Sequence, residues 1–193
     1  MKIIGITGAS GSGKSTLVKL LGLKTIDADK VARKVTEKGE DCLKELSEVF
    51  GSDILDNSGE LNRKRLAEKA FSSKENTTLL NRVTHPYIIK KIEEEIKFFE
   101  KSESEIILDA PQLFEAGCEK LCDITVGVLA EKETRISRIT ERDSLTRSQA
   151  LLRINAGKDD DFFKKNCDMI IINDGSLDKL KKEAEKIIES IRS

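Results

Sequence analysis

A glycine-rich loop near the N-terminus carries the residue types that bind phosphate groups. The motif G-x-x-x-x-G-K-S runs from Gly8 to Ser15, after the apolar run Lys2–Thr7 and before the helix-like run Thr16–Leu21. Between a strand and a helix, such a loop turns backbone N–H groups and the helix N-terminus toward an anion. The sequence therefore predicts binding of a nucleoside triphosphate, with a glycine-rich structural turn as the alternative. The expected contacts are Gly8, Gly11, Ser12, Gly13, Lys14, Ser15 and Thr16.

Two side chains of this loop and one later aspartate have the chemistry that phosphoryl transfer needs. Lys14 is expected to reach the β- and γ-phosphates, and the hydroxyl of Ser15 to ligate Mg²⁺. Asp109 ends the apolar run Glu105–Asp109. We expect its carboxylate to hold the metal or a metal-bound water.

Two further carboxylates follow the short run Lys24–Asp27, where Asp27 and Asp29 are separated by one alanine. A helix N-cap is the plain explanation for such a residue. Because capping does not require two carboxylates in three residues, we expect one of them to work in the site. Asp29 is the candidate to accept the proton of an attacking hydroxyl.

A block rich in arginine, from about residue 131 to 165, follows the apolar run Ile124–Leu129. Arginines after a strand that ends near the phosphate loop can close over a triphosphate as a lid. A solvated helical face is an equally good explanation for any single one of them. The arginines of the block are Arg135, Arg138, Arg142, Arg147 and Arg153.

Five apolar runs predict the strands of the fold. Most are continuous and β-branched, which favours strands buried on both faces of a parallel sheet, and helical segments separate them. The sequence predicts an α/β, doubly wound, five-stranded parallel sheet in a single domain over residues 1–193. The runs are Lys2–Thr7, Lys24–Asp27, Glu105–Asp109, Ile124–Leu129 and Met169–Asn173.

The stretch from about residue 30 to 104 is far longer than a crossover requires. Its apolar spacing predicts a helical insert, which we expect to cover the acceptor. One helix is expected to start near Pro86 and to present Ile88, Ile92 and Ile96 on one face. Two other helix faces in this stretch are formed by Leu43, Leu46 and Phe50, and by Leu66, Ala70 and Phe71. Outside the insert, the apolar spacing of Leu177–Ile191 predicts a final helix that packs on the core.

Composition narrows the class of protein. Charged residues make up 36% of the chain and the net charge is −1, so nothing indicates a nucleic-acid partner. No apolar run is long enough to span a membrane, and we expect no cleavable signal peptide. The four cysteines lack the spacing of a zinc site and are expected to be reduced and buried, as in a cytoplasmic protein. The sequence leaves the oligomeric state open.

Several segments beyond the loop together resemble the dephospho-coenzyme A kinase family of P-loop kinases, over nearly the whole chain. The loop itself is shared by many kinases and does not discriminate. The segments that carry the resemblance are Ile26–Arg33, Phe50–Leu55, Gly59–Arg63, Leu80–Pro86, Asp109–Glu115, Arg142–Arg147 and Ile171–Gly175.

The resemblance implies transfer of the γ-phosphate of ATP to the ribose 3′-hydroxyl of dephospho-CoA, with Mg²⁺, in the last step of CoA synthesis in the cytoplasm. It implies a P-loop kinase fold with a CoA-binding insert and a mobile lid. By motif, Asp29 activates the acceptor, Arg33 contacts substrate or phosphate, and Arg142 is the lid arginine on ATP. Arg138 is a further candidate to contact ATP as the lid closes. The acceptor side is lined by Thr7, His85, Pro86, Leu113 and Phe114.

Two other functions also fit the loop. One is a different small-molecule kinase, acting on a nucleoside or nucleotide. The other is a P-loop switch without enzymatic output, although the chain lacks an N-K-x-D motif. Individual residues also have simpler explanations. Thr7 could equally end the strand without any role in the site, and a lone histidine such as His85 is more often structural than catalytic.

Overall fold

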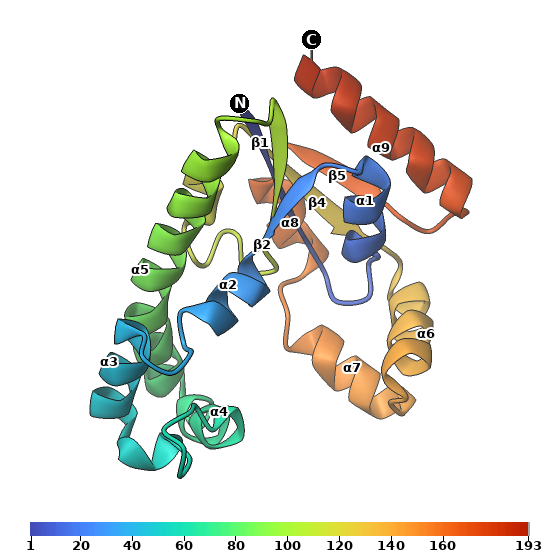
Figure 1. Ribbon diagram of the computed structural model, residues 1–193. Coiled ribbons are helices and arrows are strands. Elements are labelled where there is room, and N and C mark those ends of the chain that lie inside the picture. Colours follow the sequence, from blue (N-terminus) through green and yellow to red (C-terminus); the bar gives the residue numbers. More distant parts are fainter. Residues whose placement is uncertain (193) are drawn as a thin grey trace. The chain divides into compact units, whose positions relative to one another are not determined.

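A computed structural model describes residues 1–192 and divides the chain into two compact units. The core unit consists of Met1–Thr25 and the chain from Ser102 onward, and the insert unit is Ile26–Lys101. The insert was expected from about residue 30 to 104. Figure 1 shows the elements of both units in chain order.

Five parallel strands form one sheet, as the continuous apolar runs predicted. Its order is β2-β3-β1-β4-β5, so the first strand is central and the chain winds to both sides. Ile6 of β1 is in register with Asp109 of β3, and Gly8 with Val128 of β4. The strands are β1 (Lys2–Gly8), β2 (Lys24–Asp27), β3 (Glu105–Asp109), β4 (Ile124–Leu129) and β5 (Met169–Ile172).

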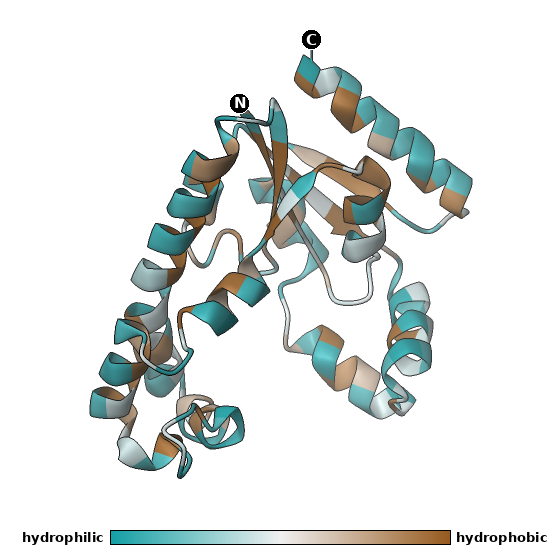
Figure 2. Cartoon of the chain, in the orientation of Figure 1, coloured by the Kyte–Doolittle hydropathy of each residue, from teal (hydrophilic) through white to brown (hydrophobic). Residues whose placement is uncertain are grey.

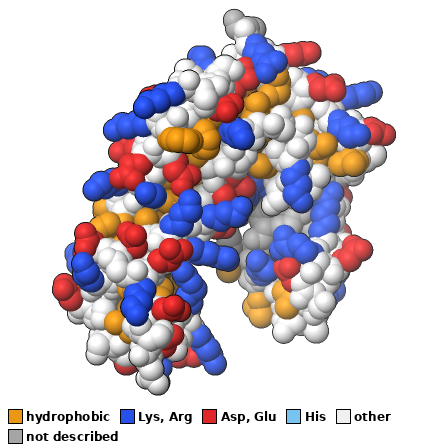
Figure 3. Space-filling model, viewed as in Figure 1, with side chains coloured by type: hydrophobic (Ala, Val, Ile, Leu, Met, Phe, Trp, Pro, Cys, Tyr) orange, Lys and Arg blue, Asp and Glu red, His pale blue; other side chains and the backbone are white. Residues whose placement is uncertain are grey.

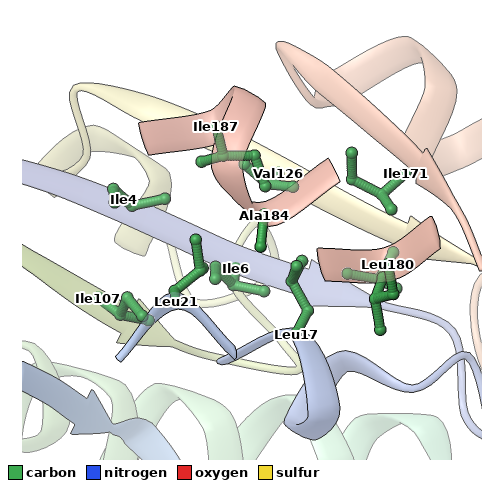
Figure 4. Close-up of a cluster of buried hydrophobic side chains, with 11 residues drawn as sticks. Ile4, Ile6, Leu17, Leu21, Ile107, Val126, Ile171, Leu180, Ala184 and Ile187 are labelled. Atoms are coloured by element: carbon green, nitrogen blue, oxygen red, sulfur yellow. The ribbon is translucent and has the colours of Figure 1, made fainter. Parts of the chain in front are cut away.

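Two helices cover one face of the central strands. Helix α1 (Lys14–Leu21) and helix α9 (Leu177–Arg192) lie side by side there, and each turns its apolar side inward (Figures 1 and 2). Burial of this apolar surface is the main source of stability for the core unit. Figure 4 shows the resulting cluster, in which the labelled side chains are Ile4, Ile6, Leu17, Leu21, Ile107, Val126, Ile171, Leu180, Ala184 and Ile187.

The other face of the core sheet is covered by α8 (Asp160–Asn166) and by the segment after β3, which ends in the short 3₁₀ helix η2 (Cys118–Leu121). Two strand glycines leave room for thiols there. A Cβ on Gly5 would lie 2.6 Å from Sγ of Cys122, and one on Gly127 would lie 2.9 Å from Sγ of Cys167. All four cysteines are free thiols, and burial raises the pKa of Cys122 to about 12.

Helices α6 (Lys132–Asp143) and α7 (Arg147–Asn155) fill most of the predicted lid block and pack on each other through Ile136, Ile139, Ala150 and Ile154. Ser144 ends α6 in the left-handed region, at φ 52°, and a capping box starts α7 at Thr146. The two helices therefore form a hairpin with a small apolar core of its own.

The insert unit is helical, as its spacing predicted. Side-chain caps at Asn62 and Ser73 set the starts of two of its helices. Ile92 and Ile96 are buried and Ile88 is half-buried, as expected, whereas Phe71 is 67% exposed instead of buried in a helix face. The helices are α2 (Ala28–Lys34), α3 (Asp41–Phe50), the short η1 (Ser52–Ile54), α4 (Arg63–Ala70) and α5 (Lys74–Phe99).

The expected helix start at Pro86 is wrong, because α5 begins twelve residues earlier, at Lys74, with Pro86 in its interior. Proline removes one backbone hydrogen bond from a helix and usually marks its first turn. Here α5 packs against α2, α3 and α4 along its length. Tertiary packing therefore outweighs the local cost of the proline.

Candidate active site

The predicted phosphate loop leaves β1 and ends at the N-terminus of α1. Gly11 and Gly13 adopt φ values of 79° and 92°, in the left-handed region that other residues rarely enter. Gly13 is the N-cap and has no side chain to cap the first turn, which also contains no acidic residue. The backbone N–H groups of this turn therefore present a positive helix end without a competing carboxylate.

Three buried or half-buried side chains donate to the carbonyl groups of this loop. Nε of Arg135 lies 2.9 Å from the Ser10 carbonyl oxygen, and Nη1 of Arg138 lies 3.2 Å from that of Ser12. Nδ2 of Asn173 donates to the same Ser12 oxygen at 2.8 Å. These three side chains hold the carbonyl groups of Ser10 and Ser12 and so fix the conformation of the loop.

Arg135 and Asn173 were not among the site residues predicted from sequence. Arg135 is only 6% exposed and also pairs with Asp160 of α8 at 3.3 Å, and burial lowers its pKa. Asn173 is 7% exposed and directly follows β5. A polar residue after a buried strand was the available indication for Asn173. For Arg135 the sequence contained no feature that distinguishes it from the exposed arginines of the same block.

Lys14 and Asp109 form an ion pair at the ends of the loop and of β3. Their side chains are 16% and 14% exposed, so the pair is largely shielded from water. Thr7 is buried and its hydroxyl donates to the carbonyl of Pro111 at 3.1 Å, which ties the end of β1 to the segment after Asp109. The core unit thus brings together the loop lysine and the carboxylate that the sequence singled out.

The donor set at this place suits Mg²⁺. The Asp109 carboxylate and the Ser15 hydroxyl are hard oxygen donors, and Mg²⁺ is usually held by one or two carboxylates together with substrate phosphates and water. Among residues 1–192, no group of three or more His, Cys, Asp or Glu side chains is arranged to hold a metal ion.

The lid arginines separate into two sets. Arg138 donates to loop carbonyls and, through Nη2, to the carbonyl of Asn173 at 2.9 Å, so it contacts the loop rather than standing away from it. Arg142 is exposed and forms a bidentate pair with Asp143, whose carboxylate raises its pKa. Asp143 also accepts a hydrogen bond from Arg153 at 2.6 Å.

The segment after β3 contains the predicted substrate residues Leu113 and Phe114. Leu113 is fully buried, and its Cδ2 would lie 3.0 Å from a Cβ placed on Gly5. The side chain of Leu113 therefore belongs to the core, and its expected contact with substrate stays a prediction. Phe114 is half-buried and packs edge-on against Phe162 at 5.8 Å between ring centres.

In the insert unit, the two aspartates after β2 differ in position. Asp27 is the N-cap of α2 and its Oδ1 accepts from the Lys30 N–H at 3.1 Å, so the capping explanation holds for Asp27. Asp29 lies in the first turn of α2 and is exposed, and Arg33 lies in the last turn of that helix. The predicted residues His85 and Pro86 lie inside α5.

The surface around these elements is strongly charged. Lys and Arg side chains are interspersed with Asp and Glu on the face seen in Figure 3. No helix among the described residues is long and apolar enough to cross a membrane.

Comparison with known proteins identifies the family. The dephospho-CoA kinase family model matches residues 2–179. A curated dephospho-CoA kinase of Listeria innocua is 42% identical over 192 residues, covering 97% of this chain and 96% of the relative. This level of identity over nearly the full length confirms the resemblance found in the sequence segments.

Solved structures agree with the fold. The dephospho-CoA kinase from Campylobacter jejuni has a TM-score of 0.72 at 31% identity, covering 99% of this chain and 98% of that one. A crystal structure from Thermus thermophilus has a TM-score of 0.83 at 32% identity, covering 98% and 97%. The α/β P-loop kinase fold is thereby confirmed. The chain belongs to the dephospho-CoA kinase family, whose members are ATP-dependent phosphotransferases.

Proposed function

We propose that this protein transfers the γ-phosphate of ATP to the ribose 3′-hydroxyl of dephospho-CoA, giving CoA and ADP, with the residues described above as its machinery. The observation that carries the residue-level proposal is the placement of Lys14, the first residue of α1, beside Asp109 at the end of β3, which is adjacent to β1 in the sheet. Ligands of open α/β sheets bind outside these carboxyl ends of the strands.

The nucleotide side of the proposal rests on the loop. Backbone N–H groups of the segment from Gly8 to Thr16 that are not bound to backbone carbonyls bind the phosphates, and Lys14 exchanges its contact with Asp109 for the β- and γ-phosphate oxygens. The carbonyl contacts from Arg135, Arg138 and Asn173 support this role, because they hold the backbone of the loop in one conformation.

The acceptor side rests on Asp29. Asp27 already caps α2, so its carboxylate is occupied by a structural task. We assign to Asp29 the contact that orients the 3′-hydroxyl and accepts its proton as the bond to phosphorus forms. Arg33 is proposed to bind the acceptor's own phosphates, and the remaining acceptor contacts are proposed for Thr7, His85, Pro86 and Phe114.

Arg142 is proposed to neutralise charge on the transferring phosphoryl group, and Arg138 to contact the nucleotide while holding the loop. Guanidinium groups suit this task because they carry charge at all relevant pH values and present several donors in one plane. Closure of the α6–α7 hairpin would also exclude water, whose attack would hydrolyse ATP without an acceptor.

Mg²⁺ is proposed to be held by Ser15 and Asp109 and to supply charge neutralisation on the phosphate oxygens when bound. The proposal includes only small-molecule partners, no nucleic acid and a cytoplasmic location.

Acceptor-dependent release of ADP tests the function. Purified protein with ATP and Mg²⁺ should release ADP only when dephospho-CoA is added, and far more slowly with a nucleoside or nucleotide in its place. Faster turnover with a nucleoside would identify a different small-molecule kinase. Slow hydrolysis that ignores every acceptor would identify a nucleotide-dependent switch.

A pair of variants tests the role of Asp29. Asp29→Asn should lower kcat by about 10²–10⁴-fold while ATP binding stays nearly unchanged. Asp27→Asn is the matched control: it removes the same charge two residues away but keeps the N-cap, since asparagine caps as well as aspartate. Loss of turnover in Asp27→Asn with normal turnover in Asp29→Asn would transfer the role to Asp27.

A further inference from the structure

The end of α6 carries a carboxylate that two arginines share. Asp143 is the last residue of α6, and Nε and Nη2 of Arg142 donate to its two oxygens at 2.8 and 2.7 Å. Nη1 of Arg153, on α7, donates to Oδ2 of Asp143 at 2.6 Å. One carboxylate therefore joins two guanidinium groups from the two helices of the lid hairpin.

The position of Asp143 is unfavourable for a helix on its own. A negative charge in the last turn opposes the helix dipole, whose C-terminal end is itself negative. The two guanidinium groups offset this repulsion, and they hold the pKa of the Asp143 carboxyl below its usual range. Exposed ion pairs add little stability, and Arg142 and Arg153 are 58% and 50% exposed. Bracing of the hairpin is therefore a weak reason for this arrangement.

The geometry leaves donors of Arg142 available for an anion. A guanidinium has five N–H donors, and the pair with Asp143 takes the Nε–Nη2 edge. Nη1, on the edge that suits bidentate binding of phosphate oxygens, takes part in none of the hydrogen bonds described for residues 1–192, and Nη2 carries a second N–H that points along that edge. Arg147 differs, because its Nη1 and Nη2 both bind Glu133 at 2.8 Å.

We propose that Asp143 is a positioning residue: it is held from the other side by Arg153 and fixes the plane of Arg142, so that the remaining donors of Arg142 meet the triphosphate as the hairpin closes. The inference rests on the proposed function of Arg142 at ATP and extends it to Asp143, a residue with no assigned role. It opposes the alternative in which Asp143 competes with phosphate for Arg142, because the carboxylate occupies a different edge.

A double-mutant cycle tests the inference. In the otherwise unchanged protein, Asp143→Asn should lower kcat/KM for ATP by about tenfold. In the Arg142→Ala background it should change kcat/KM by less than twofold, because Asp143 acts through that side chain. Glu141→Gln, which removes an exposed carboxylate two residues away, is the matched control and should leave kcat/KM and the melting temperature unchanged.

Equal losses from Asp143→Asn in both backgrounds would overturn the inference, as would a gain in ATP affinity, which marks competition. A wild-type kcat/KM for ATP in Arg142→Ala would overturn the inference as well, since Asp143 could then not act on ATP through Arg142. Should the wild-type protein release no ADP with dephospho-CoA, the proposed function fails. The Kd for ATP, measured by calorimetry over the same four proteins, then tests the role of Asp143 separately.

Discussion

Asn173 offers the sharpest test of the idea that side chains behind the phosphate loop shape the nucleotide site. Its backbone N–H donates to Leu129 at 2.8 Å, and its carbonyl accepts from Arg138, so replacement by alanine keeps both backbone contacts. Within residues 1–192, the one hydrogen bond lost is that of Nδ2 to the Ser12 carbonyl, at 2.8 Å in a buried setting.

The size of the effect follows from that bond. A buried neutral hydrogen bond contributes about 1 kcal/mol, and a partner left unsatisfied adds to the loss. Arg138 still donates to the same Ser12 oxygen, which limits the total for Asn173→Ala to about 1–2 kcal/mol. For a domain of this size, that corresponds to a fall in Tm of about 2–8 °C.

Part of the same free energy should appear in nucleotide binding, because ATP must then order the loop. We expect KM for ATP to rise about three- to tenfold. In Asn173→Asp a carboxylate oxygen would face the Ser12 carbonyl in place of a donor, so both losses should be larger than for alanine.

The assay is thermal unfolding together with KM for ATP at saturating acceptor. Asn166→Ala is the matched control, since its Nδ2 also donates to a carbonyl, that of Phe162 at 2.7 Å, but on the exposed side of α8. The reasoning is refuted if Asn173→Ala changes KM no more than Asn166→Ala does, or if Asn173→Asp is no worse than Asn173→Ala.

Two further predictions concern stability. Arg192 lowers the pKa of Glu105 through a bidentate contact at 2.7 Å. The pair therefore stabilises the fold at pH values above the ordinary carboxyl pKa of about 4.5. This stabilisation is lost as the pH falls through the lower pKa of the folded state. Glu105→Gln should therefore lower Tm by a few degrees at most at pH 7, and the difference from wild type should vanish in strong acid; a difference that persists there would exclude the ion pair as its cause. Gly5→Ala places a Cβ 2.6 Å from Sγ of Cys122 and should cost about 1–3 kcal/mol in urea unfolding. Cys122→Ala should recover part of that loss, and equal stability of Gly5→Ala with or without it would contradict the steric explanation.

Much of the fold could be predicted from local pattern. The segments that become β2, β3 and β4 were given their observed bounds. For β3 and β4 the reason is that strands buried on both faces must be continuously apolar. The loop from Gly8 to Ser15 could be predicted because its backbone requires glycines at positive φ, as at Gly11 and Gly13, and because its lysine supplies the charge that phosphate binding needs. The expected helical insert also formed.

At two positions, Pro86 and Leu113, packing set the structure. Pro86 indicates a helix start when only its own backbone bonds are considered, but α5 runs through it because three helices pack along its length. Leu113 fits a substrate-facing motif position, yet its side chain fills the space above Gly5. In each case a partner distant in the sequence decided the outcome.

The functional site, too, depends partly on local sequence and partly on contacts between residues far apart in the chain. The sequence by itself determined the chemistry: a loop that binds phosphate, a lysine, and carboxylates at strand ends. Tertiary structure decided which polar groups meet. It separated Asp27, as a helix cap, from Asp29, committed Arg135, Arg138 and Asn173 to the loop carbonyls, and joined Arg142 to Asp143. Hydrogen bonds depend on distances of about 3 Å between residues far apart in the chain, and residue types and spacing do not specify those distances until the strands and helices have packed.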